Sequence, residues 1–391
     1  MKLLQPISGT LAMNIQDTIE QALASAGLDT KAGPMQGVTE TIRQALASAG
    51  LGMATAPQAV SRTTAAADEA RTFDVEARDL GAAPAAPASA KARGQFLARS
   101  HTGPAGSRNF KLYLPPQAVK TGAAPLPLVV MLHGCTQSPD DFAAGTRMNR
   151  LADEHGLLVV YPEQPAGANP SRCWNWFRTQ DQARAGGEPE IIAGIVRAVQ
   201  SEHAVANGRV YVAGLSAGAA MALVLGETHP ELFSAVGVHS GLPFMAASDI
   251  PSALAAMKGR AAAGPAARPA STPKATGQAR QAVPTIVFHG DRDHTVQHRN
   301  GEHIVQQTVA LHAAQAPLSV RTEPGVSPGG RRYQRTLHTD TAGKPMVEAW
   351  TLHGAGHTWA GGDASGSHTD PTGPDASAAM LAFFMAHTGA S

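Results

Sequence analysis

The chain has 391 residues, of which 43% are apolar and 16% are charged. This length allows one large α/β domain with residues left over, and two large domains are not required. Lys and Arg total 31 against 30 for Asp and Glu, a formal net charge of +1, so no bulk attraction to nucleic acid or to an anionic membrane is indicated.

No export signal or membrane span is visible in the sequence. No stretch reaches the roughly 18 uninterrupted apolar residues of a membrane helix. The first residues, Met1 to Pro6, lack an apolar signal-peptide core, and a start at Met13 would be followed by the polar stretch Asn14–Glu20. We therefore expect no encoded export, and the compartment stays open.

The N-terminal region contains an internal repeat. Residues Thr18–Leu28 return as Thr41–Leu51 with a single change, Glu20 to Arg43. Each copy has apolar residues at helical spacing, a threonine suited to the helix start and a glycine suited to its end. Two copies are too few for a solenoid, so we expect a docking arm or helical hairpin, with a duplicated linker as the alternative.

Two stretches are poor in large apolar residues and rich in Ala, Pro and small polar residues. Residues 54–93 read as a tether, and Lys258–Gln281 reads as a flexible insertion between two predicted strands. We therefore expect a repeat-bearing, helical or flexible region over residues 1–95 and one large domain over residues 96–391.

Apolar runs alternate with helical patterns through the large domain. The predicted strands are Phe110–Leu114, Leu126–Leu132, Leu157–Tyr161, Val210–Ala213, Ala235–His239, Thr285–His289 and Val347–Leu352. The predicted helices are Asp141–Glu154, Pro189–Ala206, Ala217–Thr228, Gly301–Ala314 and Asp375–His387. Because several strands are apolar almost throughout, we predict an α/β fold with a mostly parallel, doubly wound sheet, flanking helices and antiparallel strands at one edge.

The segment Gly214–Gly218, Gly-Leu-Ser-Ala-Gly, lies between a predicted strand and a predicted helix. This context is typical of a nucleophile elbow, in which a tight turn exposes the serine hydroxyl above a helix N-terminus. We predict Ser216 as the nucleophile, although a plain strand-to-helix turn would have a similar pattern. A serine needs a base, and His357 follows the last predicted strand in a glycine-rich loop, where His353 is the competing histidine.

A carboxylate should lie between the serine and the histidine in the chain, just past a strand end. Asp291 and Asp293 both meet this requirement. The oxyanion of an ester hydrolysis intermediate also needs backbone N–H donors. We predict the amide of Ala217, which follows the serine, and the amide of Cys135, in the loop His133–Gln137 after an early strand. His133 itself is expected to be structural.

Aromatic residues flank the predicted site in a chain with only 5% aromatic content. Trp174, Trp176 and Trp359 are candidates for a hydrophobic substrate groove, with Phe177 a weaker one, and core packing is the alternative. The two cysteines, Cys135 and Cys173, do not have metal-ligand spacing, so we expect no zinc site and either one disulfide or two thiols. Activation by a triad and an oxyanion hole requires no metal or organic cofactor.

Five motifs together resemble the esterase family of polyhydroxybutyrate depolymerases, from about Phe96 to the C-terminus without the insertion. These motifs are His133–Gln137, Arg172–Phe177, Gly214–Gly218, Gly356–Trp359 and Gly373–Ser377. The resemblance implies an α/β-hydrolase fold and a serine esterase that acts on short-chain polyhydroxyalkanoates. In α/β-hydrolases the acid often stands three residues before a valine, which selects Asp293 over Asp291 and gives the triad Ser216, Asp293 and His357.

The resemblance also bears on the cysteines and on the substrate. Similar proteins often join the oxyanion loop to the neighbouring aromatic segment, which implies a Cys135–Cys173 disulfide. The family is typically secreted, whereas this sequence shows no signal peptide. The expected partner is a polyester or small ester. A feruloyl or acetylxylan esterase is the alternative within the enzyme class, and a polymer-granule-binding protein is the non-enzymatic alternative. Chain-length preference and oligomeric state stay open.

Overall fold

A computed structural model describes residues 94–119, 122–260 and 282–389 of the chain. These residues fall within the second of two units of the chain, Ala86–Ser391. The predicted repeat helices and residues 54–93 lie outside the described residues, as does the predicted insertion from residue 261 to 281. The division of the chain at residue 95 therefore stays a prediction.

The described residues form a ten-stranded sheet with the strand order β1-β2-β4-β3-β5-β6-β7-β10-β9-β8. The strands are β1 (Gln95–Gly103), β2 (Gly106–Leu114), β3 (Leu126–Leu132), β4 (Leu158–Pro162), β5 (Val205–Leu215), β6 (Ala235–His239), β7 (Thr285–Gly290), β8 (Ser319–Val326), β9 (Arg332–Thr339) and β10 (Pro345–Leu352). Two short strands, β11 (Trp359–Ala360) and β12 (Thr369–Asp370), pair in parallel as a separate ladder.

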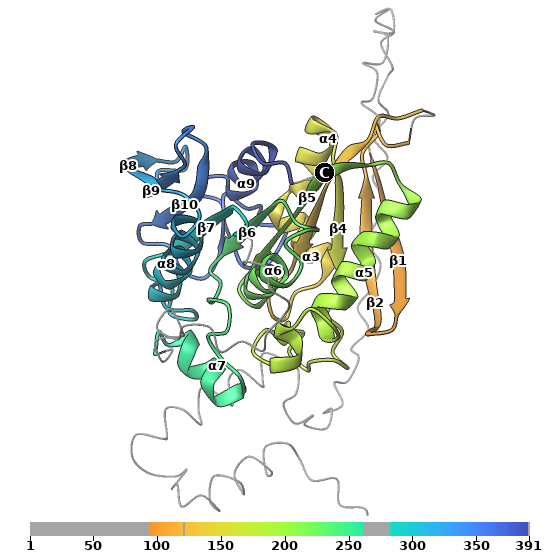
Figure 1. Cartoon of the computed structure of the whole chain (residues 1–391), viewed down its shortest axis with the longest axis horizontal. Helices are drawn as coiled ribbons and strands as arrows, with labels where there is room; N and C mark the ends of the chain where they lie inside the picture. Colours follow the sequence, from red (N-terminus) through yellow and green to blue (C-terminus); the bar gives the residue numbers. More distant parts are fainter. Residues whose placement is uncertain (1–93, 120–121, 261–281, 390–391) are drawn as a thin grey trace, which may run out of the picture. The chain divides into compact units, whose positions relative to one another are not determined.

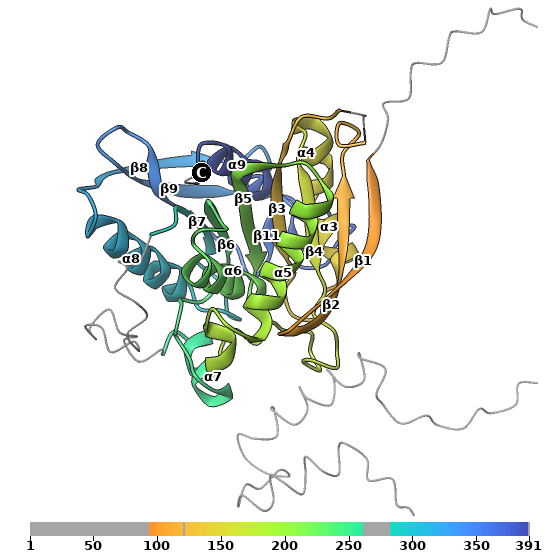
Figure 2. The same ribbon diagram turned by 45° about the vertical axis from the view of Figure 1, so that its right-hand side comes forward.

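The strands from β4 to β10 in the middle of this order run parallel, and the strands at both ends are antiparallel. Figure 2 shows β1 and β2 at one end of the row and β8 and β9 at the other. The chain steps from β3 to β4 on one side and then returns past β3 to β5 on the other. This is the doubly wound arrangement that the sequence predicts, and ligands bind such sheets at the carboxyl ends of the strands.

Helices cover both faces of the sheet. They are α3 (Pro139–Thr146), α4 (Met148–His155), α5 (Gly187–Glu202), α6 (Ala217–Thr228), α7 (Ile250–Met257), α8 (Arg299–Ala313), α9 (Ala376–Met385) and the 3₁₀ turn η2 (Thr179–Gln182). α5 and α6 cross in front of the strands in Figure 1. None of the helices in the described ranges has the length and apolar character that crossing a bilayer requires.

The side chains of β3 show how the sheet separates two cores. Leu128, Val130 and Leu132 pack with α5, α6 and α8 in one core, whereas Val129 and Met131 pack with α3, α4 and α9 in the other. All five are completely buried. Because side chains alternate across a strand, only a strand that is apolar at every position can serve two cores.

The sequence analysis missed three strands of the ten-stranded sheet, and their side chains explain why. β1, β8 and β9 are mostly exposed or half-buried, and polar residues make up much of each. Their pairing is antiparallel, through hairpins and edge contacts that do not require two buried faces. The sheet therefore has antiparallel strands at both edges, where the sequence predicted only one.

Two of the predicted helices were wrong in their extent. The predicted helix Asp141–Glu154 is divided into α3 and α4 at Arg147, which has a left-handed backbone with φ 54°. The Arg147 guanidinium donates to the Gly361 carbonyl at 2.6 Å, so a contact distant in sequence stabilises the break. The predicted helix Pro189–Ala206 ends at Glu202, because Val205 already pairs with Leu126 as part of β5.

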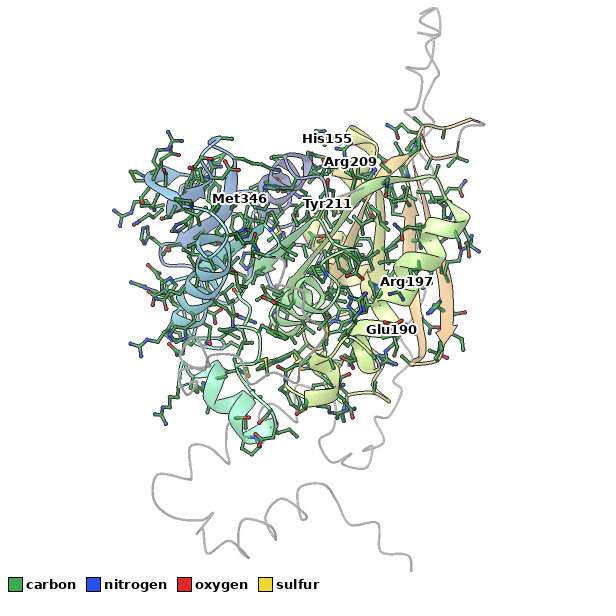
Figure 3. The ribbon with its side chains drawn as sticks, viewed as in Figure 1. His155, Glu190, Arg197, Arg209, Tyr211 and Met346 are labelled. Atoms are coloured by element: carbon green, nitrogen blue, oxygen red, sulfur yellow. A yellow bond between two sulfur atoms is a disulfide. The ribbon has the colours of Figure 1, made fainter. Side chains whose placement is uncertain are left out.

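The packing of α9 on β5 predicts a large cost for truncating Phe384. Its buried ring stacks on Tyr211, which is labelled in Figure 3, with centroids 5.1 Å apart. Phe384→Ala should lower the free energy of unfolding by about 3–5 kcal/mol because it removes this contact and leaves a cavity. Urea unfolding measures the change. The control Leu254→Ala, at a position that is 59% exposed, should cost less than about 0.5 kcal/mol, and an equal loss in both variants would contradict the packing argument.

Candidate active site

The predicted site residues come directly after the carboxyl ends of parallel strands. Ser216 follows β5, Asp293 follows β7 and His357 follows β10, while Cys135 follows β3. The carboxyl ends of parallel strands lie along one edge of a sheet. The sheet therefore brings four segments that are far apart in the sequence to one edge.

Ser216 occupies a strained turn between β5 and α6. Its backbone has φ 58° and ψ −119°, a conformation that costs free energy for any residue with a side chain. Its neighbours at positions 214 and 218 must be glycines. A Cβ on Gly214 would lie 2.4 Å from the Gly218 carbonyl carbon, and one on Gly218 would lie 2.1 Å from the Leu132 oxygen. The Gly-x-Ser-x-Gly pattern is thus a consequence of close backbone contacts.

Asp293 is the carboxylate that contacts His357. The His357 Nδ1 lies 2.7 Å from Asp293 Oδ2, and the carboxylate is buried. The other oxygen, Oδ1, accepts hydrogen bonds from the backbone N–H groups of Thr295 and Val296 at 2.9 and 2.8 Å. Burial by itself would raise the pKa of Asp293. The contacts from His289 and His357 outweigh it and hold this pKa below its ordinary value, so the carboxylate is ionised at neutral pH.

Asp291, the other candidate acid, contacts His353 and Gly354. Its Oδ1 accepts the Gly354 N–H at 2.7 Å, and its Oδ2 lies 3.0 Å from His353 Nδ1. These contacts join the turn after β7 to the start of the loop that contains His357. Asp291 therefore braces the loop, while Asp293 contacts the imidazole.

His239, at the end of β6, joins the serine turn to the histidine loop, and the sequence reasoning did not single it out. Its carbonyl accepts the Ser216 N–H at 2.9 Å, and its ring Nε2 accepts the Ala360 N–H at 3.0 Å. Complete burial, and then the electrostatic influence of the neighbouring His289 and His357 side chains, lower the pKa of His239 to about 3. The ring is therefore neutral and can keep Nε2 as an acceptor. Only its tertiary contacts reveal this role, because a histidine at a strand end has no distinctive pattern.

The structure does not connect Ser216 and His357 directly. Within the described residues, no hydrogen bond joins Ser216 Oγ to the His357 ring. His239 contacts both segments, so the two residues belong to one connected edge of the sheet.

Neither predicted oxyanion donor has an acceptor among the described residues. Among the described residues, the amides of Cys135 and Ala217 donate no hydrogen bond. The loop around Cys135 is held in place by its neighbours. The Gly134 N–H donates to Gln137 Oε1 at 2.8 Å, and the Gln137 Nε2 donates to Asp141 Oδ2 at 2.8 Å. Neither of these two hydrogen bonds uses the Cys135 N–H.

His133 is structural, as its sequence context suggested. It is 1% exposed, its Nδ1 lies 2.8 Å from the Gly134 carbonyl and its Nε2 accepts the Gln164 N–H at 3.1 Å. Because Nε2 is an acceptor, Nδ1 must hold the proton and donate it to Gly134. Burial lowers the pKa of His133, which keeps the ring in this neutral form.

Cys135 and Cys173 form a disulfide, with their Cα atoms 4.2 Å apart, as the resemblance implied. The bond joins the loop His133–Gln137 to the aromatic segment Arg172–Phe177. The neighbouring Trp174 donates its indole N–H to the His133 carbonyl at 3.1 Å. Two separate links therefore hold these segments together.

The three tryptophans predicted as substrate contacts are all buried. Trp174, Trp176 and Trp359 are 0%, 6% and 1% exposed. The Trp359 indole N–H donates to Ser377 Oγ at 3.0 Å, and its ring stacks on His239. These contacts agree with the core-packing alternative, and a substrate contact stays a prediction for all three.

No group of three or more His, Cys, Asp or Glu within the described ranges is arranged to hold a metal ion.

Comparison with known proteins identifies the family. The chain matches the Esterase PHB depolymerase family over residues 108–322. The protein belongs to this family. It is 33% identical over 232 residues to poly(3-hydroxyalkanoate) depolymerase C of Paucimonas lemoignei, covering 59% of this chain and 54% of that protein. It is 26% identical over 243 residues to a probable acetylxylan esterase A of Aspergillus clavatus, covering 59% of this chain and 74% of the relative.

A solved structure supports the fold. The acetyl xylan esterase from Aspergillus awamori matches with a TM-score of 0.54 and 21% identity, over 68% of this chain and 94% of that chain. The family and this structural match confirm the predicted α/β-hydrolase fold and the resemblance drawn from the five motifs. The chain spans about half the length of the Paucimonas depolymerase, so the activity of that protein does not transfer by similarity alone.

The disulfide predicts a measurable contribution to stability. The bond closes a loop with a sequence separation of 38. Replacing both residues, Cys135→Ser with Cys173→Ser, should lower the free energy of unfolding by about 3–4 kcal/mol, because the unfolded chain loses its cross-link. Urea unfolding with and without reductant measures this effect. Reductant should destabilise the wild type and leave the double variant unchanged, and equal unfolding midpoints for the oxidised wild type and the variant would contradict the prediction.

Proposed function

We propose that this protein is a serine carboxylic-ester hydrolase that works through an acyl-enzyme. The observation that supports the proposal most strongly is the 2.7 Å contact between His357 Nδ1 and the buried Asp293, at the same sheet edge as the strained Ser216. A carboxylate on Nδ1 leaves Nε2 as the ring nitrogen that can accept a proton. Family membership and the esterase names of the relatives agree with this chemistry.

In the proposed mechanism, Ser216 Oγ attacks the ester carbonyl while His357 Nε2 takes its proton. His357 then gives the proton to the leaving alcohol, and an acyl-Ser216 intermediate remains. Water, activated by the same imidazole, hydrolyses this intermediate and restores the serine. Asp293 stabilises the imidazolium in each step, which requires a carboxylate that stays ionised. Its lowered pKa meets that requirement.

The negative charge of each tetrahedral intermediate is assigned to the amides of Cys135 and Ala217. Both N–H groups lack an acceptor among the described residues, so binding an oxyanion breaks no existing hydrogen bond. Donors fixed before the reaction stabilise the developing charge without reorganisation, and each one lowers the barrier by about 3 kcal/mol. The triad and these amides complete the reaction without a metal or organic cofactor.

For the substrate we propose a short-chain polyhydroxyalkanoate such as polyhydroxybutyrate. The 33% identical relative is named a poly(3-hydroxyalkanoate) depolymerase, which favours this polyester over the acetylxylan or feruloyl esters of the second candidate function. Release of soluble product from polyhydroxybutyrate film, measured beside hydrolysis of acetylated xylan and methyl ferulate, separates these substrates. Faster hydrolysis of either plant ester than of the polyester would reject the choice.

The nucleophile can be tested directly. Ser216→Ala should abolish ester hydrolysis, because no other group replaces the attacking oxygen. A fluorophosphonate probe should label the wild type on the peptide that contains Ser216 and should not label the variant. If the variant retains full esterase activity, the assignment of Ser216 fails. The wild type itself tests the non-enzymatic alternative, since granule association without any hydrolysis would favour a binding protein.

The two neighbouring acids provide a matched test of the triad. Asp293→Asn should lower kcat by about 10⁴-fold, because the amide donates to His357 Nδ1 and favours the tautomer that cannot accept the serine proton. Asp291→Asn removes a loop brace and should lower kcat by less than about tenfold. Steady-state hydrolysis of p-nitrophenyl butyrate measures both. A larger loss in the Asp291 variant than in the Asp293 variant would reverse the assignment.

A further inference from the structure

Glu188 is a buried acid that the proposed reaction does not use. It lies in the first turn of α5 and is 3% exposed. Burying a carboxylate is costly unless hydrogen bonds and charges compensate it, and an apolar side chain of similar size would be cheaper. A buried acid at this position therefore calls for an explanation from its partners.

Among the described residues, every hydrogen-bond partner of the Glu188 carboxylate is a donor. Its Oε2 accepts the Asn175 backbone N–H at 2.7 Å. Its Oε1 accepts the Asn175 side-chain Nδ2 at 2.7 Å and the Gln164 Nε2 at 2.5 Å, with the Arg108 guanidinium 3.4 Å away. No partner needs a proton from Glu188, so the ionised carboxylate is the form that satisfies all four contacts.

These partners lead directly to the oxyanion loop. Asn175 is two residues from Cys173, whose disulfide partner Cys135 supplies the proposed oxyanion amide. The Gln164 Nε2 that contacts Glu188 also donates to the Cys173 carbonyl at 2.9 Å.

A second connection runs through the backbone of the same glutamine. The Gln164 N–H donates to His133 Nε2 at 3.1 Å, and the His133 ring contacts the Gly134 carbonyl next to Cys135. Glu188 thus contacts Asn175 in the aromatic segment and Gln164 in the segment after β4. The disulfide joins the first segment to Cys135, and a hydrogen bond joins the second to His133.

We propose that Glu188 is a positioning residue that holds the Cys135 amide in place to bind the oxyanion, acting through Asn175 and Gln164. This inference rests on the proposed esterase function. Glu188 does not touch the reacting atoms. It holds the aromatic segment and the segment after β4 together, so that the disulfide and His133 hold the loop from both sides.

The test uses Glu188→Gln in the full chain. The glutamine has nearly the same shape, but its amide turns an N–H donor toward at least one partner that is also a donor. We expect kcat for p-nitrophenyl butyrate to fall by about 10- to 100-fold with KM within about twofold, since displacing an oxyanion donor acts on the transition state. Active-site titration corrects each rate for the fraction of functional enzyme.

Inhibition by a trifluoromethyl ketone distinguishes positioning from general stability. The ketone adds to the serine and places an oxyanion in the hole, so its inhibition constant should rise in Glu188→Gln by the same factor that kcat/KM falls. The matched control is Glu190→Gln, on the same helix turn, whose carboxylate contacts His229 and Arg197. Glu190 and Arg197 are labelled in Figure 3. The control should keep kcat/KM and the inhibition constant within about twofold of the wild-type values.

Hydrogen exchange measured by mass spectrometry provides a readout that does not depend on activity. Glu188→Gln should speed exchange in peptides that cover residues 133–137 and 172–177, whereas Glu190→Gln should not. If Glu188→Gln does not fold, Gln164→Met carries the same tests, because it removes the side-chain link and keeps the backbone N–H to His133. We expect that variant to lower kcat by about fivefold.

The outcomes separate the two proposals. A wild type without esterase activity rejects the proposed function, and the exchange data then decide whether Glu188 positions the loop. An active wild type whose Glu188→Gln variant retains kcat and the ketone affinity overturns the positioning role. So does a variant with faster exchange throughout the chain and an unchanged inhibition constant, because that result indicates general destabilisation only.

Discussion

The structure of the site depends on one close contact between backbones, that of Gly218 with the end of β3. A Cβ on Gly218 would lie 2.1 Å from the Leu132 oxygen and 2.6 Å from the His133 oxygen, so the first turn of α6 rests directly on that strand end. On one side of this contact, Ala217 directly precedes Gly218. On the other side, Cys135 lies two residues after His133. The packing that forces the serine turn therefore also brings the two proposed oxyanion donors together.

Buried polar contacts fix the rest of this edge. His133 and His239 are both neutral because burial lowers the pKa of each, and each ring accepts a backbone N–H from a neighbouring loop. A buried ring with both nitrogens engaged has one favourable orientation. The His133 and His239 side chains, which take no part in the proposed chemistry, therefore position the loops after β4 and β10. These contacts fix the positions of the reactive groups.

The sequence could predict the parts of the molecule that depend on local pattern. Strands buried on both faces are apolar throughout, so β3, β5 and β7 were recognisable, and the glycine spacing around Ser216 marked the turn. The exposed edge strands have no such pattern, and the break at Arg147 depends on a carbonyl more than 200 residues away. Glu188 was missed for the same reason, because an acid at a helix start is ordinary until its burial is known.

Asp293 and Glu188 show how partners decide what a buried carboxylate can do. Burial raises the pKa of both, yet the pKa of Asp293 ends below its ordinary value and that of Glu188 above it. Asp293 contacts the imidazoles of His289 and His357, whereas Glu188 faces neutral amides, a more distant guanidinium and the like charge of Asp181. A carboxylate beside an imidazole can stabilise a charge that appears during a reaction. A carboxylate held by amides can only fix the groups that donate to it, which is why the two acids suit different roles within one site.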